Sequence, residues 1–121
     1  MNKLSLFIIS LLFFSCKKEN QKEALYPQES KTIVEQGQEI FEGKGNCMSC
    51  HQIENELIAP SLKTISKIYK AKNGNMVLFL QNQAAPIVDP SQFEIMKTNF
   101  EVTKTLSLKE LKALESYIYS K

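Results

Sequence analysis

The chain has 121 residues and is 43% hydrophobic, which suits one small domain and leaves no room for a second, substrate-binding one. All 15 basic residues are lysines, and 13 acidic residues nearly balance them to a formal charge of +2. This balance argues against nucleic-acid binding, which needs a basic patch far in excess of acid.

The first sixteen residues are typical of an export signal. Lys3 gives a short basic start, and the apolar or small residues of 4–14 follow. This run is too short to span a bilayer, which takes about 20 helical residues. The sequence FFSC at 13–16 resembles the lipobox of bacterial lipoproteins, which implies cleavage before Cys16 and lipidation of that cysteine. An ordinary secretory signal cut nearby is the alternative, and both predict an exported protein.

Residues 16–30 are polar and are interrupted by Pro27, so they cannot bury enough apolar surface to fold alone. As a flexible coil these residues would have a root-mean-square end-to-end distance of roughly 20 Å. We therefore divide the chain into a signal peptide (1–15), a tether (16–30) and a folded domain (31–121). The lipoprotein resemblance implies that the domain is held through Cys16 at a bacterial membrane, on the periplasmic side.

Helical signals begin at Thr32, which forms a possible capping box with Glu35. The helix that it opens should stop at Gly43 and Gly45. A second helix is predicted from Leu62 to about Lys72, with Ser61 as its cap and Asn73-Gly74 at its end. The residues expected to face the core are Ile33, Gly37, Ile40 and Phe41 in the first helix and Leu62, Ile65, Ile68 and Tyr69 in the second.

A third helix is predicted over 76–83, and a loop with two prolines over 84–90. Ser91 offers a cap for a short turn. The last helix has the clearest start, because Ser107 and Glu110 form a capping box. Its expected apolar face is Leu108, Leu111, Leu114, Tyr117 and Ile118. No stretch alternates with period two, so the sequence predicts an all-α fold of four to five short helices.

The second helix also carries four lysines, Lys63, Lys67, Lys70 and Lys72. They could form a docking patch, but a solvated helix face explains them more simply.

The residues that carry chemistry are Cys47-Met48-Ser49-Cys50-His51, the attachment pattern of c-type haem. Two thiols three positions apart fit the two vinyl groups of one haem and form thioether bonds with them. The adjacent His51 places an imidazole nitrogen under the iron. Cys16 belongs to the signal junction, so no cysteine is left over.

A thioredoxin-like redox pair, a disulfide and half a zinc site compete with this interpretation. The redox pair needs a strand and a helix around it, which the pattern does not predict. A zinc site lacks further ligands, because His51 is the only histidine. We therefore predict one covalently attached haem c per chain.

Around this motif the chain resembles the class I cytochromes c, from about Thr32 to Tyr119. Gly37-Gln38-Glu39-Ile40-Phe41 is similar to the family's first helix, in which a glycine and an aromatic residue meet the final helix. Leu114, Tyr117 and Ile118 resemble the positions that it meets. The resemblance implies the cytochrome c fold around a single haem.

Ala59-Pro60-Ser61-Leu62 resembles the family segment whose proline carbonyl accepts a hydrogen bond from the ligating imidazole. Such a bond fixes the ring and raises its basicity. Family members usually have glycine where Ala59 stands. The alternative is that Pro60 only starts a helix.

The sixth iron ligand should be a thioether, since no second histidine exists and a methionine raises the reduction potential into a carrier's range. Of the four methionines, Met1 leaves with the signal, Met48 lies between the attachment cysteines, and Met76 falls in an apolar run that is typical of a buried helix face. Met96 remains. The alternative role for Met96 is filling a gap in the core.

Residues 96–99, Met-Lys-Thr-Asn, resemble the ligand loop of small bacterial cytochromes. In that loop an asparagine three residues after the methionine contacts its sulfur, which assigns this contact to Asn99. Those relatives commonly carry prolines where Lys97 and Thr98 stand. The alternative for Asn99 is a bond to its own backbone.

A six-coordinate haem packed by apolar side chains reorganises little between its two oxidation states. We therefore expect a monomeric electron carrier, not an enzyme, that meets donor and acceptor redox proteins through small, weak interfaces. A fixed haem subunit of a larger membrane respiratory complex is the first alternative. A five-coordinate haem sensor or peroxidase is the second, although no second His, Arg or Trp is present for acid–base work.

Overall fold

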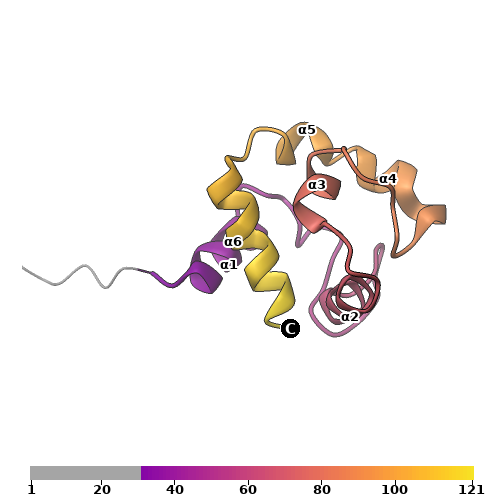
Figure 1. Ribbon diagram of the computed structural model, residues 1–121, viewed down its shortest axis with the longest axis horizontal. Coiled ribbons are helices and arrows are strands. Elements are labelled where there is room, and N and C mark those ends of the chain that lie inside the picture. Colours follow the sequence, from indigo (N-terminus) through magenta and orange to yellow (C-terminus); the bar gives the residue numbers. More distant parts are fainter. Residues whose placement is uncertain (1–30) are drawn as a thin grey trace, which may run out of the picture.

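The computed structural model describes residues 31–121 (Figure 1), so the predicted signal peptide, the tether and Cys16 lie outside the described residues. Within 31–121 the chain is helical without strands, which confirms the all-α prediction. No helix in this range has the length and apolar character needed to cross a membrane. The elements are α1 (Ile33–Glu42), α2 (Leu62–Lys72), α3 (Met76–Leu80), the 3-10 helix η1 (Pro90–Gln92), α4 (Phe93–Lys97), α5 (Phe100–Thr103) and α6 (Leu108–Tyr119).

The first and last helices begin at the capping boxes that the sequence predicts. The Thr32 N–H donates to Glu35 Oε2 at 2.7 Å, and the Glu35 N–H donates to Thr32 Oγ1 at 3.2 Å. The same exchange joins Ser107 and Glu110 at 2.7 and 3.3 Å. Each box satisfies two backbone donors that have no partner inside the helix.

The second helix has the predicted bounds, while the third is shorter than predicted. Ser61 Oγ caps α2, and Asn73 ends it in the left-handed conformation at φ 50°. We expected α3 to continue to Gln83, but it ends at Leu80. The reason is a turn in which Asn82 takes a φ of 58° and the Gln83 N–H donates to the Leu78 carbonyl at 2.8 Å.

The prediction of one short turn capped by Ser91 is wrong. Asp89 is the cap, and its Oδ1 accepts from the Ser91 N–H at 3.0 Å to start η1. The chain then forms α4 and α5, and the latter was not predicted at all. Proline at the first position of η1 favours this start, because its missing N–H is not needed there.

The core centres on the crossing of α1 and α6, which Figure 1 shows as the overlapping purple and yellow helices. The helices touch at Gly37, where an added Cβ would lie 2.0 Å from the Ala113 carbonyl oxygen. Phe41 packs on Tyr117 with ring centroids 5.4 Å apart. Ile33 and Leu108, which we expected to face the core, are 49% and 55% exposed. Each is the first residue of its helix and lies at least a turn away from the crossing.

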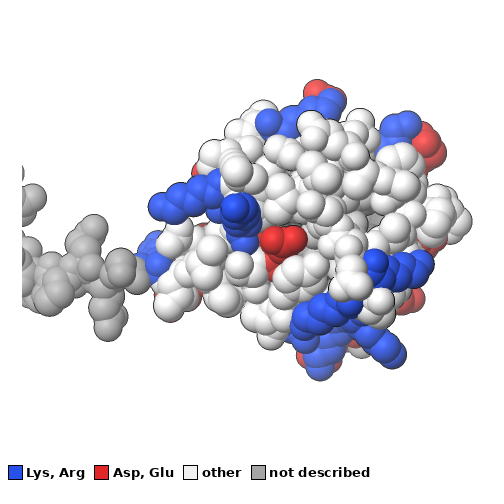
Figure 2. All heavy atoms as spheres, viewed as in Figure 1, with Lys and Arg blue, Asp and Glu red and all other residues white. Residues whose placement is uncertain are grey.

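The lysines of α2 gather at the lower right of Figure 2. Lys63 pairs with Glu54 at 2.6 Å. Lys70 Nζ donates to the Tyr119 carbonyl at 3.0 Å, and Lys72 Nζ donates to the Ile87 carbonyl at 3.1 Å. Three of the four lysines thus make contacts within the domain, and the interpretation of this face as a solvated one stays a prediction.

Glu110 gives the domain a testable dependence on pH. It accepts hydrogen bonds from Lys44 Nζ and from the backbone and hydroxyl of Ser107. The Lys44 bond, followed by the Ser107 bonds, lowers the pKa of Glu110 from 4.5 to about 2. A carboxyl whose folded pKa is depressed stabilises the fold above its unfolded pKa, and this contribution is lost as the pH falls through the folded value.

We therefore expect the stability difference between the wild type and Glu110→Gln to be fully present at pH 6. It should shrink between about pH 4.5 and pH 2. Urea unfolding of both proteins across this range measures it. A difference that does not change with pH would contradict the proposed role of the Glu110 charge.

Candidate haem-binding site

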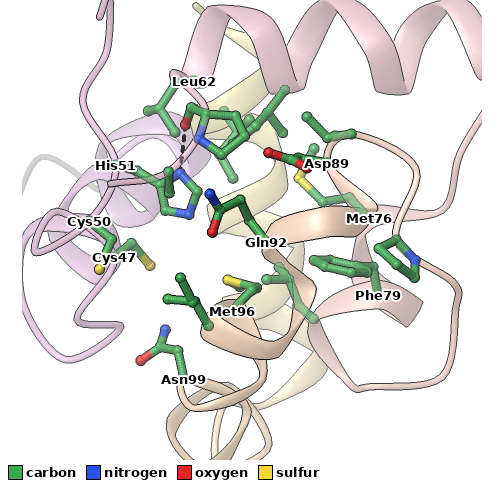
Figure 3. Close-up of a pocket in the computed structure, with 18 of the residues that line it drawn as sticks. Cys47, Cys50, His51, Leu62, Met76, Phe79, Asp89, Gln92, Met96 and Asn99 are labelled. Atoms are coloured by element: carbon green, nitrogen blue, oxygen red, sulfur yellow. Dashed lines mark hydrogen bonds between the residues drawn. The ribbon is translucent and has the colours of Figure 1, made fainter. Parts of the chain in front are cut away.

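The attachment cysteines lie in a turn that follows α1. Gly45 N–H donates to the Ile40 carbonyl at 2.8 Å, which fixes the chain against the end of α1. The N–H groups of Cys50 and His51 both donate to the Cys47 carbonyl, at 3.2 and 3.0 Å. This single helical turn puts the two thiols and the imidazole along one wall of a cavity (Figure 3).

Both thiols are free in this structure and half-buried. Burial raises the pKa of Cys47 to about 11, so its thiol is neutral at physiological pH. A neutral thiol still carries the hydrogen that adds across a vinyl double bond when a thioether forms. The pair is therefore a chemically suitable anchor for a macrocycle in the cavity.

His51 is held by one nitrogen and presents the other to the cavity. Its Nδ1 lies 2.7 Å from the Pro60 carbonyl oxygen, the bond that is dashed in Figure 3. A carbonyl oxygen only accepts, so Nδ1 carries the hydrogen and Nε2 keeps a free lone pair. Burial lowers the pKa of His51, although the Pro60 bond opposes this shift. A neutral imidazole with a free Nε2 is the form that binds iron.

The proline reaches this position because two short segments pair beside the cavity. The Leu62 N–H donates to the Gln52 carbonyl at 2.9 Å, and the Lys63 N–H donates to the Ile53 carbonyl at 3.3 Å. These bonds bring the start of α2 beside the residues that follow His51. Pro60 lies just before Ser61, the cap of α2, and its carbonyl contacts the imidazole, so it does more than precede a helix.

The rest of the cavity is mainly apolar and draws on α1, α2, α3, α4 and α6. Two of the lining rings, Phe79 and Phe93, lie 6.2 Å apart between centroids. Phe100 does not line the cavity but packs on Phe79 with centroids 5.5 Å apart. A flat hydrophobic macrocycle fits such walls, with thiols at one end and an imidazole nitrogen aimed inward. Apolar residues lining the cavity include Phe41, Leu62, Ile65, Met76, Phe79, Leu80, Val88, Phe93, Met96, Leu114 and Ile118.

Met96 and Met76 both line the cavity. Met96 is half-buried on α4, and in Figure 3 its side chain points into the space that His51 faces. Met76 is 2% exposed and belongs to the core. The sequence pattern places Met76 on a buried helix face, and the structure adds that this face borders the cavity. Met48 is 54% exposed and is not among the lining residues.

Asn99 also lines the cavity, and its amide makes a bond that the sequence did not suggest. Its Nδ2 donates to the carbonyl oxygen of Gly45 at 3.0 Å, across 54 positions of sequence. Gly45 lies two residues before Cys47. The predicted contact of Asn99 with the Met96 sulfur stays a prediction.

Four polar residues of the cavity wall were not predicted as site residues from the sequence: Asn46, Asp89, Gln92 and Thr98. Gln92 points into the cavity from the start of α4 (Figure 3). Asn46 directly precedes the attachment motif. Asp89 and Gln92 carry no motif, because their position depends on how the segment between α3 and α4 folds over the cavity.

Comparison with known proteins agrees with this geometry. The model of the Cytochrome c family matches residues 34–121. A comparison with curated proteins found no match to the chain. Proteins of the Cytochrome c family bind haem c covalently and use it in electron transfer. The matched residues include the whole site from Cys47 to Asn99, all of α6 and all of α1 except its first residue, and the chain therefore belongs to the cytochrome c family.

Proposed function

We propose that this protein is a single-haem, class I cytochrome c that carries one electron at a time between redox proteins. The observation that supports this most directly is the pairing of His51 with Pro60. At 2.7 Å this bond leaves Nε2 as the free nitrogen of a fixed, neutral ring that faces an apolar cavity. Histidines that bind a metal almost always donate their other ring N–H in this way, which fixes the tautomer and the orientation of the ring.

Each residue of the site then has a defined task. Cys47 and Cys50 would hold the haem through thioethers, His51 and Met96 would be the ligands of its iron, and Pro60 would orient the imidazole. The bound haem supplies the one-electron chemistry at its iron, with a potential raised by the methionine sulfur. The apolar walls exclude water, so the ligands reorganise little when the charge of the site changes.

The full chain, matured in a host with haem-ligation machinery, tests this proposal. We expect a coloured protein whose mass exceeds that of the polypeptide by one haem after denaturation in acid. The oxidised protein should show a sulfur-to-iron charge-transfer band. A colourless protein in which both Cys47 and Cys50 can be alkylated would refute the proposal.

We further propose that the domain is exported and anchored by a lipid on Cys16, on the periplasmic side of a bacterial membrane. The FFSC sequence at 13–16 and the polar tether after it support this. There the carrier would act as a monomer on donor and acceptor redox proteins through small interfaces.

A Cys16→Ala variant should move from the membrane fraction to the soluble periplasmic extract with its haem spectrum unchanged. Fractionation followed by mass measurement of the mature N-terminus checks this. A wild-type protein that is soluble and carries no lipid mass would contradict the anchor.

A further inference from the structure

The segment that carries Met96 is weakly tied to the rest of the domain. No residue of α4 is buried. Within residues 31–121, the hydrogen bonds of segment 89–99 stay within four positions of sequence, with a single exception. The other support is apolar packing: Met96 packs against the core, and Phe93 packs on Phe79 and Phe100 with centroids about 6 Å apart.

The exception is the bond from Asn99 Nδ2 to the Gly45 carbonyl oxygen at 3.0 Å. Asn99 shares a turn with Met96, because its backbone N–H donates to the Met96 carbonyl, also at 3.0 Å. The bond therefore joins the turn that bears the sulfur to the segment that bears the attachment cysteines.

Gly45 is a firm point of attachment. Its N–H is bonded to the Ile40 carbonyl at the end of α1. An added Cβ at Gly45 would lie 2.6 Å from that same oxygen, so the turn is packed closely against the helix. A group that is bonded to the Gly45 carbonyl is therefore held in position relative to α1, and not relative to another loop.

Haem attachment changes the partners of this carbonyl. Cys47 Sγ also donates to it at 3.3 Å. When a thioether forms, the Cys47 S–H adds across a vinyl C=C bond: sulfur bonds to one carbon and the hydrogen goes to the other. The sulfur then has no hydrogen to donate, and Asn99 is left as the side-chain donor to Gly45.

We propose that Asn99 is a positioning residue: its bond to the Gly45 carbonyl holds the Met96 turn against the haem-attachment segment and limits how often Met96 leaves the iron. This proposal rests on the proposed function, because it takes Met96 as the iron ligand. It differs from the role implied by resemblance, in which the Asn99 amide contacts the Met96 sulfur. A contact to the sulfur would change the reduction potential, whereas the bond to Gly45 would change the rate at which Met96 leaves the iron.

The rate at which imidazole replaces Met96 in the ferric holoprotein distinguishes these roles. At saturating imidazole the observed rate equals the rate of Met96 release. Asn99→Leu removes the amide donor while keeping a similar volume, and we expect release to become up to about 10-fold faster, as the loss of one net hydrogen bond allows. The charge-transfer band at equilibrium should remain.

Thr105→Val is the matched control. The Thr105 hydroxyl donates only to the nearby Val102 carbonyl at 2.7 Å, and Thr105 does not line the cavity. Removing this local bond should change the release rate by less than about 2-fold, because it does not connect the Met96 turn to α1.

The proposal is overturned if Asn99→Leu releases Met96 no faster than Thr105→Val does. A changed reduction potential with an unchanged release rate would instead assign Asn99 to the sulfur. If Asn99→Leu fails to mature, nuclear Overhauser contacts between the Asn99 side-chain amide and Gly45 in the ferrous wild type decide: their presence supports the bond and their absence overturns it. A wild type without the charge-transfer band would refute the proposed function itself, which is a separate result.

Discussion

Met96→Ala should yield a protein that still holds its haem covalently but whose iron has lost the sulfur ligand. The thioethers to Cys47 and Cys50 do not depend on Met96, so the haem content should stay at one per chain. The charge-transfer band of the oxidised protein should vanish. The reduced wild type should not bind carbon monoxide. The reduced Met96→Ala variant should bind about one equivalent per haem, because a coordination position has opened.

The matched control is Met76→Leu. Met76 lines the same cavity and is 2% exposed. Its side chain is the other methionine of the described cavity wall and thus the alternative sulfur ligand. Leucine conserves most of its volume, and such exchanges cost less than about 1.5 kcal/mol. The Met76→Leu variant should keep the charge-transfer band and should not bind carbon monoxide. The reverse pattern, with the band lost in Met76→Leu and kept in Met96→Ala, would move the ligand to Met76.

The helices that the sequence predicted correctly are those whose ends are encoded locally. Thr32 with Glu35, and Ser107 with Glu110, exchange hydrogen bonds within one turn. Ser61 and Asn73 likewise define α2 through their own caps. A capping bond spans three or four positions, so its residues are visible together in the chain, and the helix can be inferred from them without knowing the fold.

The segment from 81 to 103 was predicted poorly because long-range contacts shape it. Thr103 is fully buried, and its hydroxyl donates to the Leu80 carbonyl at 2.6 Å across 23 positions. This bond ties α5 to the end of α3. Asn99 binds Gly45 across a still longer stretch. Neither pair has a spacing that marks it, since each depends on how the chain returns to α1 and α3.

The candidate site divides in the same way. The attachment motif at 47–51 is contiguous, so its chemistry could be predicted from the residues alone. The Pro60 carbonyl was predicted only through family resemblance, and the structure supplies its distance to His51. The inward direction of Met76 and Gln92 required the fold, because the phase of a helix of five residues, like α3, or of three, like η1, is set by what it packs against.

At the crossing of α1 and α6 we expect a large loss of stability when Gly37 is replaced by alanine. In an isolated helix, glycine to alanine stabilises by about 1 kcal/mol. At Gly37 the sign should reverse, because the new Cβ would lie 2.0 Å from the Ala113 carbonyl oxygen and 2.7 Å from Tyr117 Cβ. One of these neighbours is backbone and cannot rotate away. We expect Gly37→Ala to destabilise the holoprotein by at least about 2 kcal/mol, near the upper part of the range for overpacking, measured by urea unfolding.

Gln38→Ala is the control, since Gln38 is the next residue of α1 and is exposed. It should change the stability by less than about 0.5 kcal/mol. If Gly37→Ala unfolds at the same urea concentration as this control, then the helices can separate by the width of a methyl group without loss. In that case the close approach at Gly37 would not be what fixes α1 against α6.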